Sequence, residues 1–157
     1  MPESAYIETT IVSYLTARPS RDLVQRAHQR LTRKWWNTRR SDFDLYVSPL
    51  VLQEAGGGNA AQARRRVTAL HGIAVLGTTP EAVQLAAALV RQGPIPKKAD
   101  VDAMHIAIAA VHGIEYLVTW NCTHIANAAM RSQIENICRA TGYEPPVLCT
   151  PEELMED

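Results

Sequence analysis

The sequence has few features that would point to disulfides or to a membrane. Its three cysteines are an odd number and never form a Cys-x-x-Cys pair, so neither a disulfide framework nor a zinc or redox motif is expected at Cys122, Cys138 and Cys149. No apolar run approaches the roughly 18 residues of a membrane span, and the N-terminal segment lacks a signal-peptide pattern. We therefore expect a reduced, cytoplasmic protein with no membrane contact.

Excess charge of either sign is also missing. The chain has 16 Lys and Arg against 16 Asp and Glu, which gives a formal net charge of zero. This balance excludes broad electrostatic coating of nucleic acid and leaves a local basic patch open. The length of 157 residues and the apolar fraction of 46% predict one globular domain over residues 1–157.

Short apolar runs alternate along the chain with longer segments of helical period. The runs are typical of buried parallel strands, which we predict at 5–9, 45–48, 73–77, 115–119 and 147–150. Helices are predicted at 11–17, 21–39, 60–70, 80–91, 101–112 and 125–140, with Ser20 as the N-cap of the second. The alternation predicts an α/β fold: a single-domain, three-layer sandwich in which helices cover both faces of a parallel sheet of about five strands.

Polar residues follow the predicted strands where such a sheet would place its functional crevice. Glu8 ends the first strand, Glu54 comes one turn after the second, Asp102 opens a helix, and Asn121 follows the fourth strand. Carboxylates among apolar neighbours repel one another and are costly unless a cation compensates them. We therefore predict that Glu8, Glu54 and Asp102 bind a hard divalent metal ion.

Each of these residues also has a structural interpretation. Asp102 could supply negative charge to a helix N-terminus, with Asp100 as its N-cap. Glu54 could be a solvated last-turn residue, and Asn121 could simply begin a turn. His105 lies one helical turn after Asp102, where it could contact substrate phosphate or carry a proton, but a hydrogen-bonded core histidine fits that position equally well.

The sequence resembles a known family, the PIN-domain ribonucleases, and within it the VapC-like toxins of type II toxin-antitoxin pairs. The resemblance runs over nearly the whole chain and depends on four segments in order, YIETTI at 6–11, SPLVLQE at 48–54, ADVDAMHIA at 99–107 and YLVTWN at 116–121. Two positions depart from the usual pattern: Glu8 stands where the family commonly has Asp, and Asn121 where an Asp is usual.

The resemblance implies a metal-dependent endoribonuclease that uses Mg²⁺ or Mn²⁺, with a homodimeric state and an antitoxin partner. It implies that Glu8, Glu54 and Asp102 are metal ligands, and that Asn121 is a weaker ligand. Thr9 or Thr119 would hydrogen-bond phosphate or water near the metal. Asp100 would lie behind the ligands or cap the helix.

Basic residues could guide RNA toward this site. Lys97 and Lys98 lie close to Asp102 in sequence and are the better candidates for steering. Trp35 and Trp36 stand among basic residues, an arrangement that could stack bases, although one tryptophan packed on the sheet is the stronger expectation.

One alternative to an enzyme remains open at the level of sequence. Glu8 and Asn121 could mark a PIN scaffold that cuts poorly and instead binds RNA or a protein. RNA binding without metal-dependent cleavage would favour it. A dinucleotide-dependent enzyme is disfavoured, because the segment after the first strand offers no glycine for close approach to a pyrophosphate.

Overall fold

The computed structural model describes residues 1–155. Within them the chain forms a five-stranded sheet in the order β3-β2-β1-β4-β5, and every neighbouring pair of strands is parallel. The strands are β1 (Glu3–Ile7), β2 (Phe43–Val47), β3 (Ala74–Val75), β4 (Tyr116–Val118) and β5 (Val147–Cys149). The predicted parallel α/β sheet is therefore confirmed.

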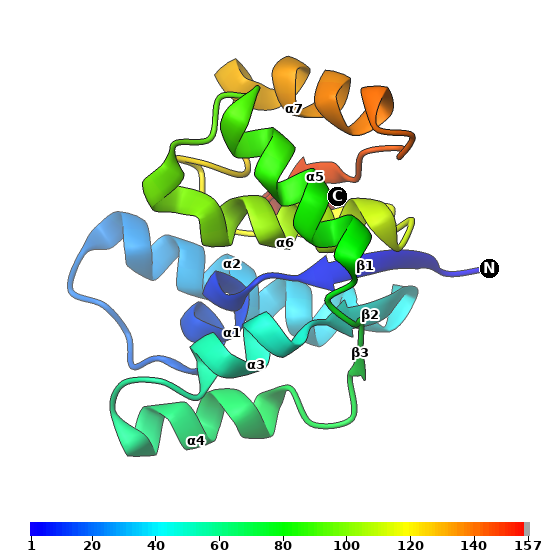
Figure 1. Cartoon of the computed structure of the whole chain (residues 1–157). Helices are drawn as coiled ribbons and strands as arrows, with labels where there is room; N and C mark the ends of the chain where they lie inside the picture. The colour runs from blue at the N-terminus through cyan, green and yellow to red at the C-terminus, as the bar shows by residue number, and fades with distance from the viewer. Residues whose placement is uncertain (156–157) are drawn as a thin grey trace.

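Seven α-helices belong to the same described range, and Figure 1 shows how they surround the sheet. Their bounds are α1 (Thr9–Thr16), α2 (Leu23–Thr38), α3 (Pro49–Ala55), α4 (Ala60–Ala69), α5 (Pro80–Arg91), α6 (Asp100–Val111) and α7 (Ala128–Ala140). None of the helices in residues 1–155 has the length and apolar character that crossing a membrane requires.

The register of the strands places α6 and α2 on opposite faces of the sheet. Tyr6 of β1 points toward α6, because its hydroxyl bonds to His105. Phe43 of β2 is paired with Glu3 of β1 and therefore lies on the same face of the sheet as Glu3. Glu3 and Tyr6 are an odd number of residues apart, so they point to opposite faces. The Phe43 ring contacts Trp35 of α2, at 5.7 Å between centroids. Since side chains alternate between faces, the two contacts lie on opposite sides, and the predicted three-layer arrangement is confirmed.

Several helices begin at the residues that helix capping favours. Ser48 and Thr79 accept backbone N–H bonds at the starts of α3 and α5, and proline follows each of them. Gly113 and Gly142 end helices with φ of 70° and 95°, where a side chain would be strained.

Some predicted boundaries were wrong for local reasons. β1 ends at Ile7, because Glu8 caps α1 and accepts a bond from the backbone of Thr10. The N-cap of α2 is Asp22, whereas the predicted cap, Ser20, accepts a bond from the backbone of Asp22.

Two further corrections affect the helices next to the predicted site. Asp100 does not cap α6 but is its first residue, and Ala99 precedes it without a side-chain cap. The helix predicted from residue 125 begins only at Ala128, because Asn127 caps it after a turn that starts at Asn121.

Candidate active site

The candidate site lies at the carboxyl ends of β1 and β4, the neighbours at which the strand order changes direction. Glu8 follows β1, and its backbone N–H donates to the Val118 carbonyl of β4 at 3.1 Å. Thr119 follows β4 directly. Ligand sites of open parallel sheets occur at this kind of position.

The Glu8 carboxylate is buried, with 4% of the residue exposed, and hydroxyl groups surround it. Its Oε1 accepts hydrogen bonds from the Thr119 hydroxyl at 2.7 Å, the Thr10 hydroxyl at 2.5 Å and the Thr10 backbone N–H at 3.1 Å. Three donors on one oxygen compensate much of the cost of burying the charge. Thr119 thus holds Glu8 in place.

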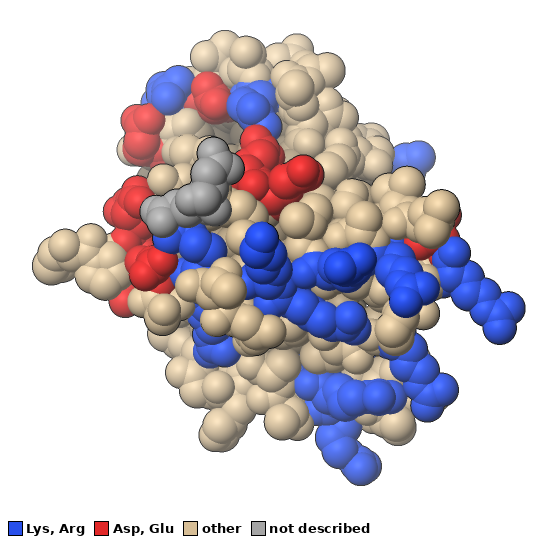
Figure 2. All heavy atoms as spheres, turned by 180° about the vertical axis from the view of Figure 1, so that it is seen from behind, with Lys and Arg blue, Asp and Glu red and all other residues tan. Residues whose placement is uncertain are grey.

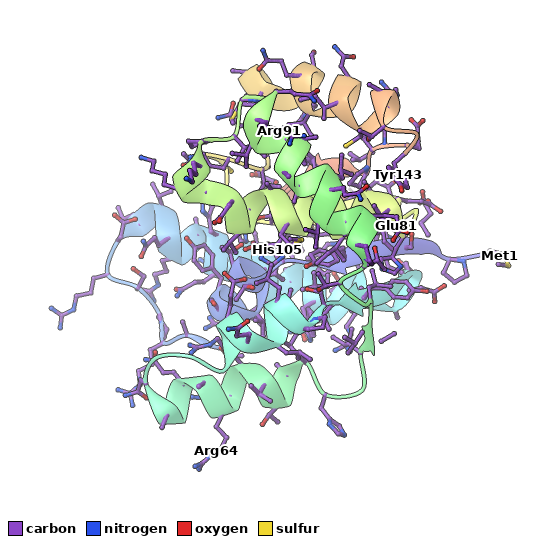
Figure 3. The ribbon with its side chains drawn as sticks, viewed as in Figure 1. Met1, Arg64, Glu81, Arg91, His105 and Tyr143 are labelled. Atoms are coloured by element: carbon purple, nitrogen blue, oxygen red, sulfur yellow. The ribbon has the colours of Figure 1, made fainter. Side chains whose placement is uncertain are left out.

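Glu54, at the end of α3, is tied to both Thr9 and α6. Its Oε1 accepts bonds from the Thr9 hydroxyl at 2.7 Å and from Nε2 of His105 at 2.7 Å. His105 itself is fully buried and lies on the side of α6 that faces the rest of the molecule (Figure 3). The interpretation of His105 as a hydrogen-bonded core histidine is confirmed.

Behind His105 a chain of hydrogen bonds runs into the core. Its Nδ1 lies 2.6 Å from the Tyr6 hydroxyl, which lies 2.8 Å from Oγ of Ser48. Burial raises the pKa of Tyr6 well above its usual range, so the phenol stays protonated. With Nε2 donating to the Glu54 carboxylate, Nδ1 accepts a hydrogen bond from the Tyr6 phenol, so the two ring nitrogens satisfy both neighbours.

These contacts change the acidity of Glu54. Burial acts to raise its pKa, but the hydrogen bonds from His105 and Thr9 outweigh burial and hold the pKa below its ordinary value of 4.5. A depressed carboxyl pKa contributes stability that is present above the unfolded-state pKa and is lost as the pH falls through the folded-state pKa.

We therefore expect acid to destabilise the wild-type protein more than the Glu54→Gln variant. The difference should develop as the pH falls below about 4.5, because only the wild type must then protonate the hydrogen-bonded carboxylate at position 54. Urea unfolding in EDTA at a series of pH values measures it, with Asp44→Asn at an exposed position of β2 as the control. Parallel pH profiles of wild type and Glu54→Gln would contradict the role given to His105 and Thr9.

Asp102, in the first turn of α6, is paired with a residue that the sequence did not single out. Its Oδ2 lies 3.0 Å from Nδ1 of His124, and about a fifth of each side chain is exposed. Asn121 helps to place that histidine, because its Oδ1 accepts the His124 backbone N–H at 3.0 Å. Asn121 thus starts a turn, as its structural interpretation predicted.

The three carboxylates have different partners, and this bears on the predicted metal site. Within residues 1–155, no three His, Cys, Asp or Glu side chains form a group that could hold a metal ion. In the same range, protein donors reach only one oxygen of each carboxylate, Oε1 of Glu8, Oε1 of Glu54 and Oδ2 of Asp102.

The donor chemistry nevertheless suits a hard cation. Each of these carboxylates keeps a second oxygen for a ligand, and Mg²⁺ typically uses one or two protein carboxylates together with water. The residues fit such an open arrangement better than a closed cage of three ligands. The metal role of Glu8, Glu54 and Asp102 stays a prediction.

The remaining predicted residues lie around this centre. Thr9 bonds to Glu54, while Asp100 is exposed at the first position of α6. Lys97 and Lys98 are exposed on a short 3₁₀ helix immediately before α6. Their roles toward RNA stay predictions.

Sequence reasoning missed three partners of the site, Tyr6, Ser48 and His124. Ser48 carried a usable signal, because serine before proline commonly caps a helix. Tyr6 and His124 gave none, since their partners lie 99 and 22 residues away in the chain.

The expectation that one of the two tryptophans packs in the core is confirmed for Trp35. Trp35 is fully buried in the core, and the guanidinium of Arg40 lies 4.2 Å from the ring centroid of the half-buried Trp36.

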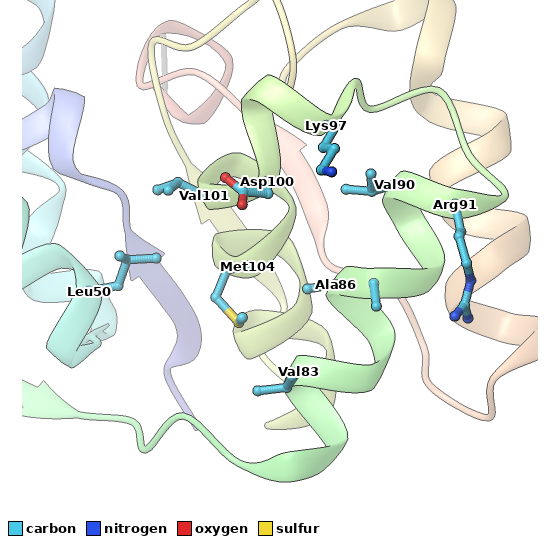
Figure 4. Close-up of a pocket in the computed structure, with 10 residues that line it drawn as sticks. Leu50, Val83, Ala86, Val90, Arg91, Lys97, Asp100, Val101 and Met104 are labelled. Carbon is cyan, nitrogen blue, oxygen red and sulfur yellow. The ribbon is translucent and has the colours of Figure 1, made fainter.

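An apolar groove of about 570 Å³ lies between α3, α5 and α6 (Figure 4). Val83 and Val101 contribute to its lining and are 49% and 40% exposed. Charged side chains of both signs, Lys97 and Asp100 among them, lie at its edge. A surface of this kind is typical of an interface.

The class of fold follows from this geometry and from solved structures that share it. VapC20 of Mycobacterium tuberculosis, a toxin that cleaves the sarcin-ricin loop, has a TM-score of 0.58 and 17% identity, over 91% of this chain and 100% of that one. No family model matches the sequence, and no curated protein matches it.

A second similar structure comes from a toxin-antitoxin complex. It is VapBC2 of Rickettsia felis bound to a DNA fragment from its promoter, with a TM-score of 0.54 and 16% identity, over 76% of this chain and 88% of that one. The fold of this chain is therefore that of VapC toxins, the PIN fold, as its motifs predicted. At these identities the likeness establishes the fold.

Proposed function

We propose that this chain is a metal-dependent endoribonuclease and the cytoplasmic toxin of a toxin-antitoxin pair. The observation that carries the proposal is the placement of Glu8, Glu54 and Asp102. Each lies near the carboxyl edge of a PIN-type sheet and keeps one oxygen free of protein donors among residues 1–155. The likeness to a toxin that cleaves RNA supports the same reaction class.

In this proposal Glu8, Glu54 and Asp102 hold Mg²⁺ or Mn²⁺, and the bound ion supplies electrophilic stabilisation of the phosphodiester. The residues around them fix the carboxylates in advance. Thr119 and Thr10 orient Glu8, while His105 and Thr9 orient Glu54. Such outer contacts matter because a ligand that is already oriented loses less freedom when it binds the ion.

The exposed ammonium groups of Lys97 and Lys98 would attract the RNA backbone toward the start of α6. Asn121 would act through the turn that places His124 against Asp102. Its amide oxygen is already engaged by a backbone N–H, which makes this positioning role the better supported one.

The proposal includes two protein partners. An antitoxin is supported by the toxin-antitoxin complex among the similar structures. A second copy of the chain is supported by the groove of Figure 4, because its exposed apolar residues Val83 and Val101 could be covered by the same face of a partner, as a self-complementary interface requires. A measured mass equal to that of the monomer, in solution at micromolar concentration, would contradict the proposed homodimer.

The direct test is cleavage of a mixed RNA by the purified wild-type protein in Mn²⁺ or Mg²⁺ and in EDTA. We expect cleavage only with metal, and a melting temperature that rises with added Mn²⁺, because a ligand that binds the folded state stabilises it. Metal-independent products, or an unchanged melting temperature, would count against the metal.

The alternative function is a PIN-fold module that binds RNA or a protein without efficient cleavage. One observation favours it: among residues 1–155 no three candidate ligands are grouped around one point. RNA binding by a protein that shows no cleavage in any metal would establish it.

A further inference from the structure

Three aromatic rings from α1, α2 and the segment after β4 pack together, and neither the candidate ligands nor the predicted RNA contacts account for them. The rings of His28 and Trp120 are stacked at 4.0 Å between centroids and 10° between planes. Tyr14 is within 24° of parallel to Trp120 and within 21° of parallel to His28, at 6.3 Å from each. Three rings from separate segments of the chain thus lie close together in nearly parallel planes.

This aromatic cluster is joined directly to the candidate site. The Trp120 backbone N–H donates to the Thr10 hydroxyl at 2.8 Å, and that hydroxyl donates to Glu8. Tyr14 follows Thr10 by one turn of α1, so both lie on the same side of that helix. The cluster is therefore connected to the Glu8 carboxylate through the Thr10 hydroxyl.

The rings differ in exposure in a way that suits a binding platform. Trp120 is 9% exposed, and its indole N–H donates to the Thr32 hydroxyl at 2.7 Å, which fixes the ring in the core. His28 and Tyr14 are half-buried and offer the accessible part of the cluster. A rigid inner ring with outer rings at the surface presents an ordered face to a planar ligand.

Positive charge continues from the cluster along α2. The helix has four basic residues and no acidic one within its bounds, and the face of the molecule seen from behind has a band of Lys and Arg (Figure 2). A hollow on the same helix is lined by the apolar residues Ala27 and Leu31 and by the basic residues Arg30 and Lys34. Aromatic rings beside free basic groups are the combination that binds single-stranded nucleic acid.

We infer that Tyr14 and His28, supported from behind by Trp120, form a stacking subsite for an unpaired RNA base, with Arg30 and Lys34 holding the adjoining phosphates. The inference rests on RNA being the substrate of the proposed function and adds the form that this substrate takes. Stacking requires a base free of its duplex, so the site would select single-stranded or looped RNA.

The test measures binding separately from cleavage. A short single-stranded RNA with one 2-aminopurine is titrated in EDTA, where metal-dependent cutting stops, and quenching reports stacking of the base. We expect Tyr14→Ala and His28→Ala each to weaken binding about tenfold, the effect of removing one stacking partner. His28→Phe should restore the affinity, and His71→Ala, at an exposed histidine elsewhere, should leave it unchanged.

An RNA that carries a terminal dye and lacks the base at the 2-aminopurine position, titrated by fluorescence anisotropy alongside the same dye-labelled RNA with the base present, separates stacking from a structural role. The wild type should bind this abasic RNA about tenfold more weakly, and Tyr14→Ala and His28→Ala should weaken it no further. Equal losses on both RNAs would make the cluster structural, and unchanged affinities would assign it to a protein contact; either result overturns the inference. Intact quenching without cleavage in Mn²⁺ would instead contradict only the proposed function.

Discussion

Replacing Asp102 with Asn should abolish metal-dependent RNA cleavage while the protein stays folded. The substitution removes one negative charge and leaves a side chain of the same shape. Changes in groups that merely orient a metal ligand cost about 10- to 100-fold in metal affinity or activity. We expect the loss of a ligand charge to cost at least the upper end, about 100-fold. The measurement compares initial rates on mixed RNA in Mn²⁺.

The stability of the Asp102→Asn variant should change little, since two effects oppose each other. The partly exposed pair with His124 is worth no more than about 1 kcal/mol, and the removal of one carboxylate relieves repulsion among the acidic groups. The melting temperature in EDTA should therefore stay within about 4 °C of wild type.

Asp44→Asn is the matched control, because it makes the same substitution at an exposed position of β2. It should cleave as wild type does, and its melting temperature should still rise with Mn²⁺. Retained cleavage by Asp102→Asn, or a Mn²⁺-induced rise equal to that of wild type, would remove Asp102 from the metal site.

The order of the five strands and of six of the seven helices within residues 1–155 could be predicted from the sequence, because strands buried on both faces appear as continuous apolar runs, but α3 was not predicted as a helix. The same rule located Glu8 and Thr119, which follow β1 and β4 directly. The exact end of β1 could not be predicted, because it depends on the Glu8 carboxylate turning back to cap α1.

The hydrogen-bond partners of the site residues could not be predicted from the sequence, for a different reason. A hydrogen bond such as that between Tyr6 and His105 depends on which face of β1 the tyrosine occupies and on how α6 crosses the sheet. Neither is encoded in local periodicity. The same holds for His124, which reaches Asp102 only because the chain turns at Asn121.

These contacts also explain how the fold accommodates the Glu8 and Glu54 carboxylates. Glu8 and Glu54 each accept bonds from neutral hydroxyls, and Glu54 has an imidazole N–H as well. Hydrogen bonds to the charged form compensate the cost of desolvation. The same hydrogen bonds fix the orientation of each carboxylate.

The largest effect on stability is expected at His105. The residue is fully buried, and it links Tyr6 to Glu54. In His105→Ala the buried Tyr6 hydroxyl loses its acceptor, which costs about 1–3 kcal/mol, and the cavity adds to the loss. We expect a total of roughly 3 kcal/mol or more and a melting temperature about 6–12 °C lower. His71→Ala, at an exposed histidine, should change stability by less than about 0.5 kcal/mol.

A double-mutant cycle distinguishes a lost hydrogen bond from a lost volume. Tyr6→Phe removes only the hydroxyl and should cost about 1–2 kcal/mol, because Nδ1 of His105 is then left without its donor. In the double variant Tyr6→Phe/His105→Ala the hydroxyl can no longer be orphaned, so the combined loss should be smaller than the sum by about 1 kcal/mol. Urea unfolding of the four proteins at neutral pH measures this coupling. Strictly additive losses would mean that Tyr6 and His105 stabilise the fold independently, and that the hydrogen-bond chain behind Glu54 does not act as a unit.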